Sequence, residues 1–148
     1  MKKSFRGLIA DGGQEQIRLS TNNGLTGYKV VKFELFPDTP GQNSVESTVQ
    51  VFTAEQDTPS TTAVTVQFDD PTLIGAAFYA AASSADNSEK TVIVFDNMTF
   101  NQDIFVTHTN TSGSQPINYY IELEQMKLSK DEATVATLKD MRAGPSSI

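Results

Sequence analysis

The chain has 148 residues, a length at which one domain can bury a hydrophobic core without disulfides or metals to hold it. It contains no cysteine and a single histidine, which excludes disulfide scaffolds, thiolate metal sites and cysteine nucleophiles, and we expect no cofactor and no metal. The net charge of −7 argues against a nucleic-acid partner, because phosphate binding depends on clustered lysine and arginine.

Apolar and polar residues alternate along most of the chain, and this period of two predicts half-buried strands. The alternation is regular in 31–35 and in 64–68. Residues 73–82 fit either a ninth strand or a helix of one turn and a half. The predicted strands, in chain order, are 4–10, 14–20, 27–36, 45–55, 61–68, 91–96, 103–109 and 117–128.

Eight antiparallel strands in a chain of this size are typical of a two-layer sandwich. We therefore predict an all-β fold, an antiparallel β-sandwich with a jelly-roll-like topology, as a single domain over residues 1–148. Within it, residues 1–10 are interpreted as either an N-terminal arm or an edge strand.

The buried face of the last predicted strand changes side along its length. Ile121 and Leu123 share one parity, whereas Met126 and Leu128 take the other. A β-bulge near Gln125 would restore the register, and we expect one there.

One helix is predicted after the last strand, at 130–142. Residues 129–132 (S-K-D-E) form a capping box, in which the serine and glutamate side chains satisfy each other's backbone amides. Val135, Leu138 and Met141 follow at intervals of three and form a narrow apolar stripe. We expect this stripe to pack against the chain's own sheet or, alternatively, against a neighbouring subunit.

Acidic residues offer oxygen ligands of the kind that calcium prefers. No stretch of the chain follows a calcium-loop pattern, and Asp-Asp-Pro is a common turn at the end of a strand. A structural turn is therefore the preferred interpretation, and we expect no metal site. The residues considered are Asp69, Asp70, Asp96, Asn101 and Asp103.

Glu122, Glu124 and His108 are the remaining candidates for acid–base chemistry. The two glutamates lie two residues apart on one strand face, as glycoside hydrolysis could use, but such a pair more often faces water opposite lysine or threonine. His108 shares its parity with Ile104 and Val106 near a strand end, and we expect it at the rim, bonded to a backbone carbonyl or a threonine. No nucleophile motif accompanies it, so we predict no catalytic residue and no enzymatic activity.

Two segments, 100–102 and 118–120, combine aromatic rings with amides. Rings stack on the apolar faces of sugars and amides bond sugar hydroxyls, so these segments are candidate glycan contacts. The absence of tryptophan weakens this interpretation, and the alternative is that they are core and turn residues.

Charge is distributed unevenly. Residues 1–36 carry six basic groups against three acids, whereas 37–110 carry Lys90 alone against ten acids. The chain either docks by a basic end or presents a solvated acidic surface that only aids solubility. The apolar run at 8–10 is too short for an export signal, which needs roughly 7–15 residues, so we expect synthesis in a cytoplasm and no membrane partner.

Several segments of the sequence resemble those of a known group of proteins. They are D-G-G-Q-E and N-N-G-L-T-G-Y-K-V-V-K-F (11–15 and 22–33), F-D-N and F-N-Q-D-I-F-V-T-H (95–97 and 100–108), and N-Y-Y-I-E-L-E and T-V-A-T-L-K-D (118–124 and 134–140). They resemble small structural proteins of tailed bacteriophages from marine samples. The resemblance implies a virion component that is made in many copies in the cytoplasm of a host bacterium.

Together these observations predict a non-enzymatic virion structural protein. We expect a capsid decoration or cement protein that acts as a symmetric homo-oligomer and binds the major capsid protein or other virion proteins. Two alternatives stay open: a connector or adaptor in the neck or tail, and a carbohydrate-binding module for host glycans.

The predicted docking segment is the basic N-terminus. The helix stripe, Val135, Leu138 and Met141, is the predicted helix contact, and the acidic loops at 37–43, 55–60 and 84–90 are expected to face solvent. The residues predicted to dock are Lys2, Lys3, Phe5, Arg6, Leu8 and Ile9.

Overall fold

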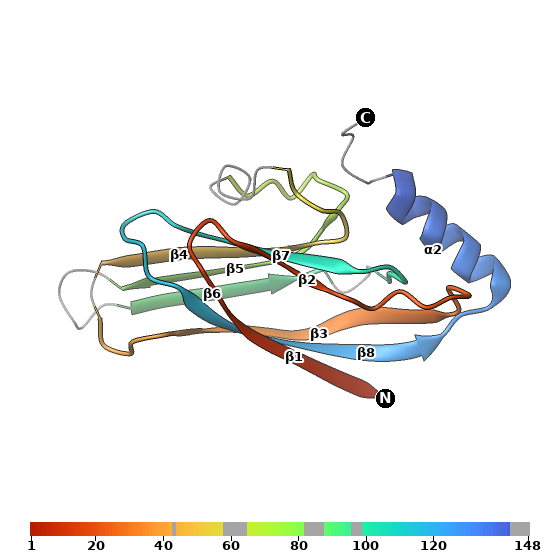
Figure 1. The fold of residues 1–148 in the computed structure, drawn as a ribbon, viewed down its shortest axis with the longest axis horizontal. Coiled ribbons are helices and arrows are strands. Elements are labelled where there is room, and N and C mark those ends of the chain that lie inside the picture. Colours follow the sequence, from red (N-terminus) through yellow and green to blue (C-terminus); the bar gives the residue numbers. More distant parts are fainter. Residues whose placement is uncertain (43, 58–64, 82–87, 96–98, 143–148) are drawn as a thin grey trace.

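The structure, a computed structural model, describes residues 1–42, 44–57, 65–81, 88–95 and 99–142. Two antiparallel sheets pack face to face, and a helix lies at one end of them (Figure 1). This arrangement confirms the predicted all-β sandwich. Its elements are β1 (Lys2–Ile9), β2 (Gln14–Ile17), β3 (Thr26–Pro37), β4 (Val45–Phe52), β5 (Leu73–Ala81), β6 (Ser88–Val94), β7 (Ile104–Asn110), β8 (Ile117–Lys127) and α2 (Lys130–Arg142).

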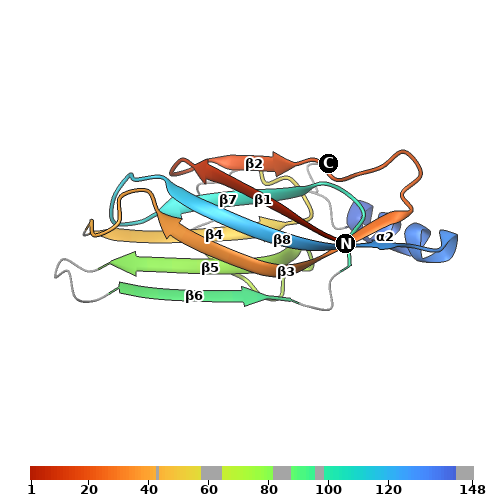
Figure 2. The ribbon, with the colours of Figure 1, turned by 90° about the horizontal axis from the view of Figure 1, so that it is seen from below.

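The strand order is that of a jelly roll with one change (Figure 2). A jelly roll joins its first, eighth, third and sixth strands in one sheet and its second, seventh, fourth and fifth in the other. Here the three-stranded sheet has the order β1-β8-β3 and the five-stranded sheet the order β2-β7-β4-β5-β6. β6 therefore pairs with β5 instead of β3. Of the two alternatives for residues 1–10, the structure has the edge strand, since β1 pairs with β8 along its length.

The core lies between the two sheets because each strand turns alternate apolar side chains inward. β4 and β7 show this clearly: Val49 lies opposite His108 and Val51 opposite Val106, and all four side chains are buried. The other strands add inward-facing residues to the same cluster. Its members include Ile9, Ile17, Val30, Phe33, Leu35, Ile74, Ile104, Ile117, Ile121 and Leu123.

The structure settles two segments of the predicted strand order, 73–82 and 61–68. Residues 73–82, which fitted a strand or a short helix, form strand β5. The strand predicted at 61–68 is wrong in its described part, because Thr65–Phe68 has no strand partner, and residues 61–64 lie outside the described part of the chain. β4 already pairs with β7 and β5 on its two sides, so this segment crosses the sheet instead, and the Thr65 carbonyl accepts a bond from the Gln50 amide. Alternation without a free strand edge does not form a strand.

The predicted bulge is misplaced. The register between β3 and β8 shifts at Val31 of β3, between Val30 and Lys32, while β8 keeps its register through Gln125. An extra residue in either partner restores the parity of a strand pair, so the pattern of one strand does not tell which partner holds it. The bulge lets both Val30 and Phe33 face the core and leaves Val31 exposed.

Helix α2 begins and ends where the sequence predicts. The capping box forms: the Glu132 amide donates to Ser129 Oγ at 3.1 Å, and the Ser129 amide donates to Glu132 Oε1 at 3.0 Å. Among the described residues, no helix combines the length and the apolar character that crossing a membrane requires.

Candidate functional site

The candidate site is the surface of β1, β8 and β3 that is turned away from the core, which we call the outer face. Figure 2 shows these three strands in front, with no described element over them. The outer surface of the other sheet, by contrast, is partly covered, since Gln56 exchanges hydrogen bonds with Gln14 of β2. The strand registers place on the outer face Lys2, Ser4, Arg6, Leu8, Lys29, Lys32, Glu34, Phe36, Asn118, Tyr120, Glu122 and Glu124.

Side chains of the outer face form rows across the three strands. Leu8, Asn118 and Phe36 make one row, in which an amide lies between two apolar side chains. Leu8 is 52% exposed and Phe36 is 60% exposed. Cross-strand neighbours of this kind lie close enough to act as one surface. This row is therefore an apolar contact patch on an otherwise polar sheet face.

The neighbouring row contains Arg6, Tyr120 and Glu34. Together the two rows line a groove of about 540 Å³, which Lys90 of β6 also borders. The groove thus offers an aromatic ring, a carboxylate and cations beside the apolar patch. Such a surface can hold a protein loop or a sugar.

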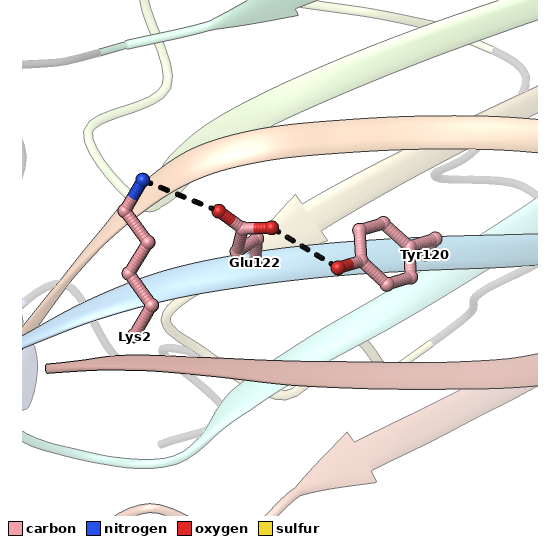
Figure 3. A network of polar contacts seen from close by, with 3 residues as sticks. All are labelled: Lys2, Tyr120 and Glu122. Atoms are coloured by element: carbon pink, nitrogen blue, oxygen red, sulfur yellow. Dashed lines mark hydrogen bonds and ion pairs between the residues drawn. The ribbon is translucent and has the colours of Figure 1, made fainter.

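Toward the other end of the outer face, Glu122 joins a lysine and a tyrosine in one polar network (Figure 3). Lys2 Nζ lies 3.5 Å from Glu122 Oε1, and the Tyr120 hydroxyl donates to Glu122 Oε2 at 3.0 Å. Lys32 Nζ lies 5.9 Å from the centre of the Tyr120 ring, within the range of a cation–π contact. The basic residues of the N-terminal part thus share a surface with carboxylates of β8.

The two glutamates considered for catalysis lie on the outer face. Glu122 accepts from Tyr120 and pairs with Lys2, while Glu124 lies opposite Lys2 on β1 and Lys29 on β3. This is the solvated arrangement opposite lysine that the sequence analysis preferred.

The register of β1 divides the predicted docking residues. Lys2, Arg6 and Leu8 face outward, whereas Phe5 packs against the core and Ile9 is buried in it. Lys3 has the inward parity but is exposed near the strand's start. The surface-anchor role expected for Phe5 and Ile9 is therefore corrected: alternate residues of a strand point to opposite faces, and these two hold β1 to the sandwich.

The aromatic–amide segments divide in the same way. Asn118 and Tyr120 lie on the outer face, but the Tyr119 hydroxyl turns inward and donates to Glu15 Oε1 of β2 at 2.7 Å. Burial raises the pKa of Tyr119 above its usual value, and the bond to Glu15 raises it further. The other segment is internal, since Phe100 stacks on the Tyr28 ring in the core.

The sequence analysis placed His108 at the rim of the sandwich, but the structure shows that it is fully buried inside. Its Nδ1 lies 3.1 Å from the Ile9 carbonyl oxygen, and its Nε2 lies 2.9 Å from Ser47 Oγ. The expected carbonyl partner is present, and a serine takes the place of threonine. Burial lowers the pKa of His108, while the Ile9 carbonyl and the charge of Asp11 oppose this shift. His108 therefore ties the end of β1 to β4.

Two of the carboxylates considered for calcium, those of Asp70 and Asp103, accept hydrogen bonds from backbone amides. Asp70 Oδ1 accepts from the amide and the hydroxyl of Thr72, as in the predicted turn. Burial on its own would raise the pKa of Asp103, but hydrogen bonds from the amides of Ser20 and Leu19 lower it below its usual value. Asp96 lies outside the described residues. Within the described part of the chain, no three potential metal-ligating side chains cluster.

The predicted helix contact is turned away from the sheets. Ala133 and Ala136 are the buried residues of α2, while Val135 is 65% exposed and Leu138 is 50% exposed. The side chain of Met141 is not among those that the structure describes. The preferred expectation, packing of this stripe on the chain's own sheet, is therefore wrong for Val135 and Leu138, because small alanines allow the closer approach.

Of the two rows that line the groove, Phe36 and Glu34 are the residues that the sequence analysis did not single out. Phe36 directly follows the inward-facing Leu35 and so has the outward parity of β3, which makes it an apolar residue at a solvent position. An apolar residue at an outward-facing position of a strand is the sequence signal that could have identified Phe36 as part of the site. Of the predicted acidic loops, 37–43 and 55–60 are exposed at Asp38 and at Glu55. The loop predicted at 84–90 is wrong in its described part, because residues 88–90 pair with β5 as the start of strand β6, and residues 84–87 lie outside the described part of the chain.

Comparisons with known proteins add little. No protein-family model and no curated protein matches the chain. Among solved structures, one from Bacillus endospore appendages, described as disulfide-linked pili, aligns over 87% of both chains with 13% identity and a TM-score of 0.36. A TM-score at this level does not establish a shared fold.

Proposed function

We propose that the chain is a non-enzymatic structural protein that binds a protein partner through its outer face, as a decoration protein on the shell of a tailed bacteriophage. The observation that carries the proposal is the row of Leu8, Asn118 and Phe36. Two large apolar side chains stand exposed on one sheet face, in register, with no described element covering them.

The energetics favour a protein partner for this row. Burying a leucine or phenylalanine side chain contributes roughly 1.5–3 kcal/mol, and binding energy concentrates in a few such central contacts. Arg6, Glu34 and Lys90 border the row, and such charged groups suit the polar rim of an interface. The expected partner surface has an apolar recess and mixed charge.

The phage assignment has separate support. The sequence phrases resemble structural proteins of marine tailed phages, and a chain without cysteine and with its single histidine buried offers complementary surfaces more than reactive groups. Attachment to the major capsid protein in many copies makes modest single-site contacts sufficient, because neighbouring copies raise the effective concentration.

The test is co-sedimentation of purified protein with phage shells that lack it. Phe36→Ser should weaken shell binding about ten- to hundredfold, from the lost burial of one phenylalanine. Phe68→Ser is the control at a second exposed phenylalanine, because Phe68 is 54% exposed on the segment bonded to β4 of the other sheet. Its ring packs edge-on against Phe95, so circular dichroism must first show that this variant folds. Equal binding of the Phe36→Ser variant and the wild type would overturn the proposal, and binding to isolated necks or tails but not to shells would move it to a connector role.

A second candidate is carbohydrate binding, which the groove favours. Tyr120 and Phe36 offer rings, while Asn118 and Arg6 offer hydrogen-bond donors in a hollow of about 540 Å³. Asn118→Leu separates the two candidates, since it removes the amide but keeps an apolar row. Loss of glycan-array binding in Asn118→Leu, with shell binding retained, would support the sugar site, and a wild type that binds no glycan at millimolar concentration would remove it.

A further inference from the structure

Helix α2 is attached to the sandwich by one face and leaves the other free. Asn101, which is fully buried, donates from Nδ2 to the Ala133 carbonyl at 3.3 Å and to Thr137 Oγ1 at 2.8 Å. The residues that face the sandwich are thus small or polar. Val135 and Leu138 are exposed on the opposite side, and in Figure 1 no other described element lies beyond α2 at this end of the sheets.

The exposed residues belong to a stripe with a charge at each end. Positions 131, 135, 138 and 142 are separated by four, three and four residues, the spacing that keeps side-chain positions on one line of an α-helix. The sequence places Asp131, Val135, Leu138 and Arg142 at these positions. The stripe therefore begins with an acid, continues with two apolar residues and ends with a base.

We propose that two copies of the chain associate through α2, with the helices antiparallel about a twofold axis. This arrangement sets Val135 against the partner's Leu138 and Asp131 against the partner's Arg142, each twice. A parallel arrangement would instead oppose like charges at both ends. A twofold interface requires a surface that is complementary to itself. The stripe meets this requirement only when the two helices run antiparallel.

Leu138 also borders a hollow of about 420 Å³ between α2 and the segment that contains Leu25, which is wide enough for a partner's side chain but not for its helix. The contact is small, about 20 Å of helix length from each copy. We therefore expect a weak dimer, with a Kd on the order of 0.1 mM, that becomes populated where copies are crowded.

Sedimentation of the full chain over a range of concentrations tests the association. The wild type should self-associate, and Val135→Lys should be a folded monomer, because the Val135 side chain is 65% exposed and lies outside the core. Val66→Lys is the matched control, since Val66 is 39% exposed on the segment bonded to β4 and is not part of α2, and it should associate like the wild type. A monomeric wild type at about 1 mM, or an unchanged dimer in Val135→Lys, would overturn the proposal.

Charge reversal tests the antiparallel geometry. Asp131→Lys and Arg142→Glu should each weaken the dimer about tenfold, because two symmetry-related attractions become repulsions. An equimolar mixture of the two variants should recover wild-type affinity, since every end pair is then opposite in charge. Unchanged affinity in both single variants would refute the antiparallel pairing. Phe36→Ser should leave self-association intact. Loss of shell binding in Phe36→Ser therefore tests the proposed function, whereas loss of self-association in Val135→Lys tests the dimer.

Discussion

Lowering the pH should destabilise the protein through its single histidine. His108 is fully buried between the Ile9 carbonyl and the Ser47 hydroxyl, and burial lowers its pKa from the ordinary value of 6.5. In the folded chain it stays neutral at a pH where the unfolded chain already takes up a proton. The contribution of His108 to stability is therefore complete above pH 6.5 and is lost as the pH falls.

The magnitude follows from this difference in proton uptake. Between pH 7.5 and pH 5.5, the free energy of unfolding should fall by up to about 1.4 kcal/mol, the value for one group that binds a proton only in the unfolded state. Asp103, whose pKa is lowered below 3.8, contributes its own loss only at more acidic pH. The interval thus isolates His108, which also links β1, and with it Leu8, to β4.

Urea unfolding followed by circular dichroism at pH 7.5, 6.5 and 5.5 measures the effect. His108→Gln removes the titrating group, and its stability should be nearly constant over this interval. Because the chain has one histidine, NMR of the wild type gives its titration directly, even if the variant folds poorly. A wild-type stability that is flat from pH 7.5 to 5.5, or an imidazole that titrates at or above pH 6.5, would refute the reasoning.

Further predictions concern the contacts that hold the helix and the two sheets. Asn101→Ala should lower the free energy of unfolding by about 2 kcal/mol in urea titrations, because it leaves buried acceptors without a donor. Thr137→Val should lower it by about 1 kcal/mol. Equal stability of the wild type and both variants would contradict the helix attachment. Gly7→Ala should lower the melting temperature, because its Cβ would lie 2.9 Å from a carboxylate oxygen of β2 and 3.0 Å from the Tyr119 ring, and an unchanged melting point would show that this contact yields freely. Since the pKa of Tyr119 is raised in the fold, stability should fall by about 1.4 kcal/mol per pH unit above pH 10, and Tyr119→Phe should lose that part of the slope. Ser129→Ala should reduce the helical circular dichroism signal and cost about 1 kcal/mol, and an unaltered spectrum would argue against the cap.

Local patterns predicted the elements well where each pattern has one structural solution. The capping box at 129–132 fixed the start of α2, and the alternation at 31–35 predicted β3. Thr65–Phe68 failed because a strand also needs a partner edge, which no local pattern encodes. The bulge at Val31 escaped prediction because either strand of a pair can hold the extra residue.

The candidate site was predictable only in fragments. Composition and parity gave Leu8, Arg6 and Tyr120 as surface candidates in two separate sets, but only the pairing of β1 and β3 with β8 brings them together. His108 illustrates the reverse case, since its parity indicated an inward position and its burial depends on β1 closing over it. The outward turn of Val135 depends likewise on which residues of α2 fit closest to the sheets.

Reconstruction by cryo-electron microscopy of shells saturated with the purified protein tests the central claim most directly. The account predicts that β1, β8 and β3 lie against the shell, with Leu8 and Phe36 at the contact and the five-stranded sheet turned away from it. A bound protein that touches the shell with the five-stranded sheet, or shells that carry no bound protein at saturating concentration, would contradict it.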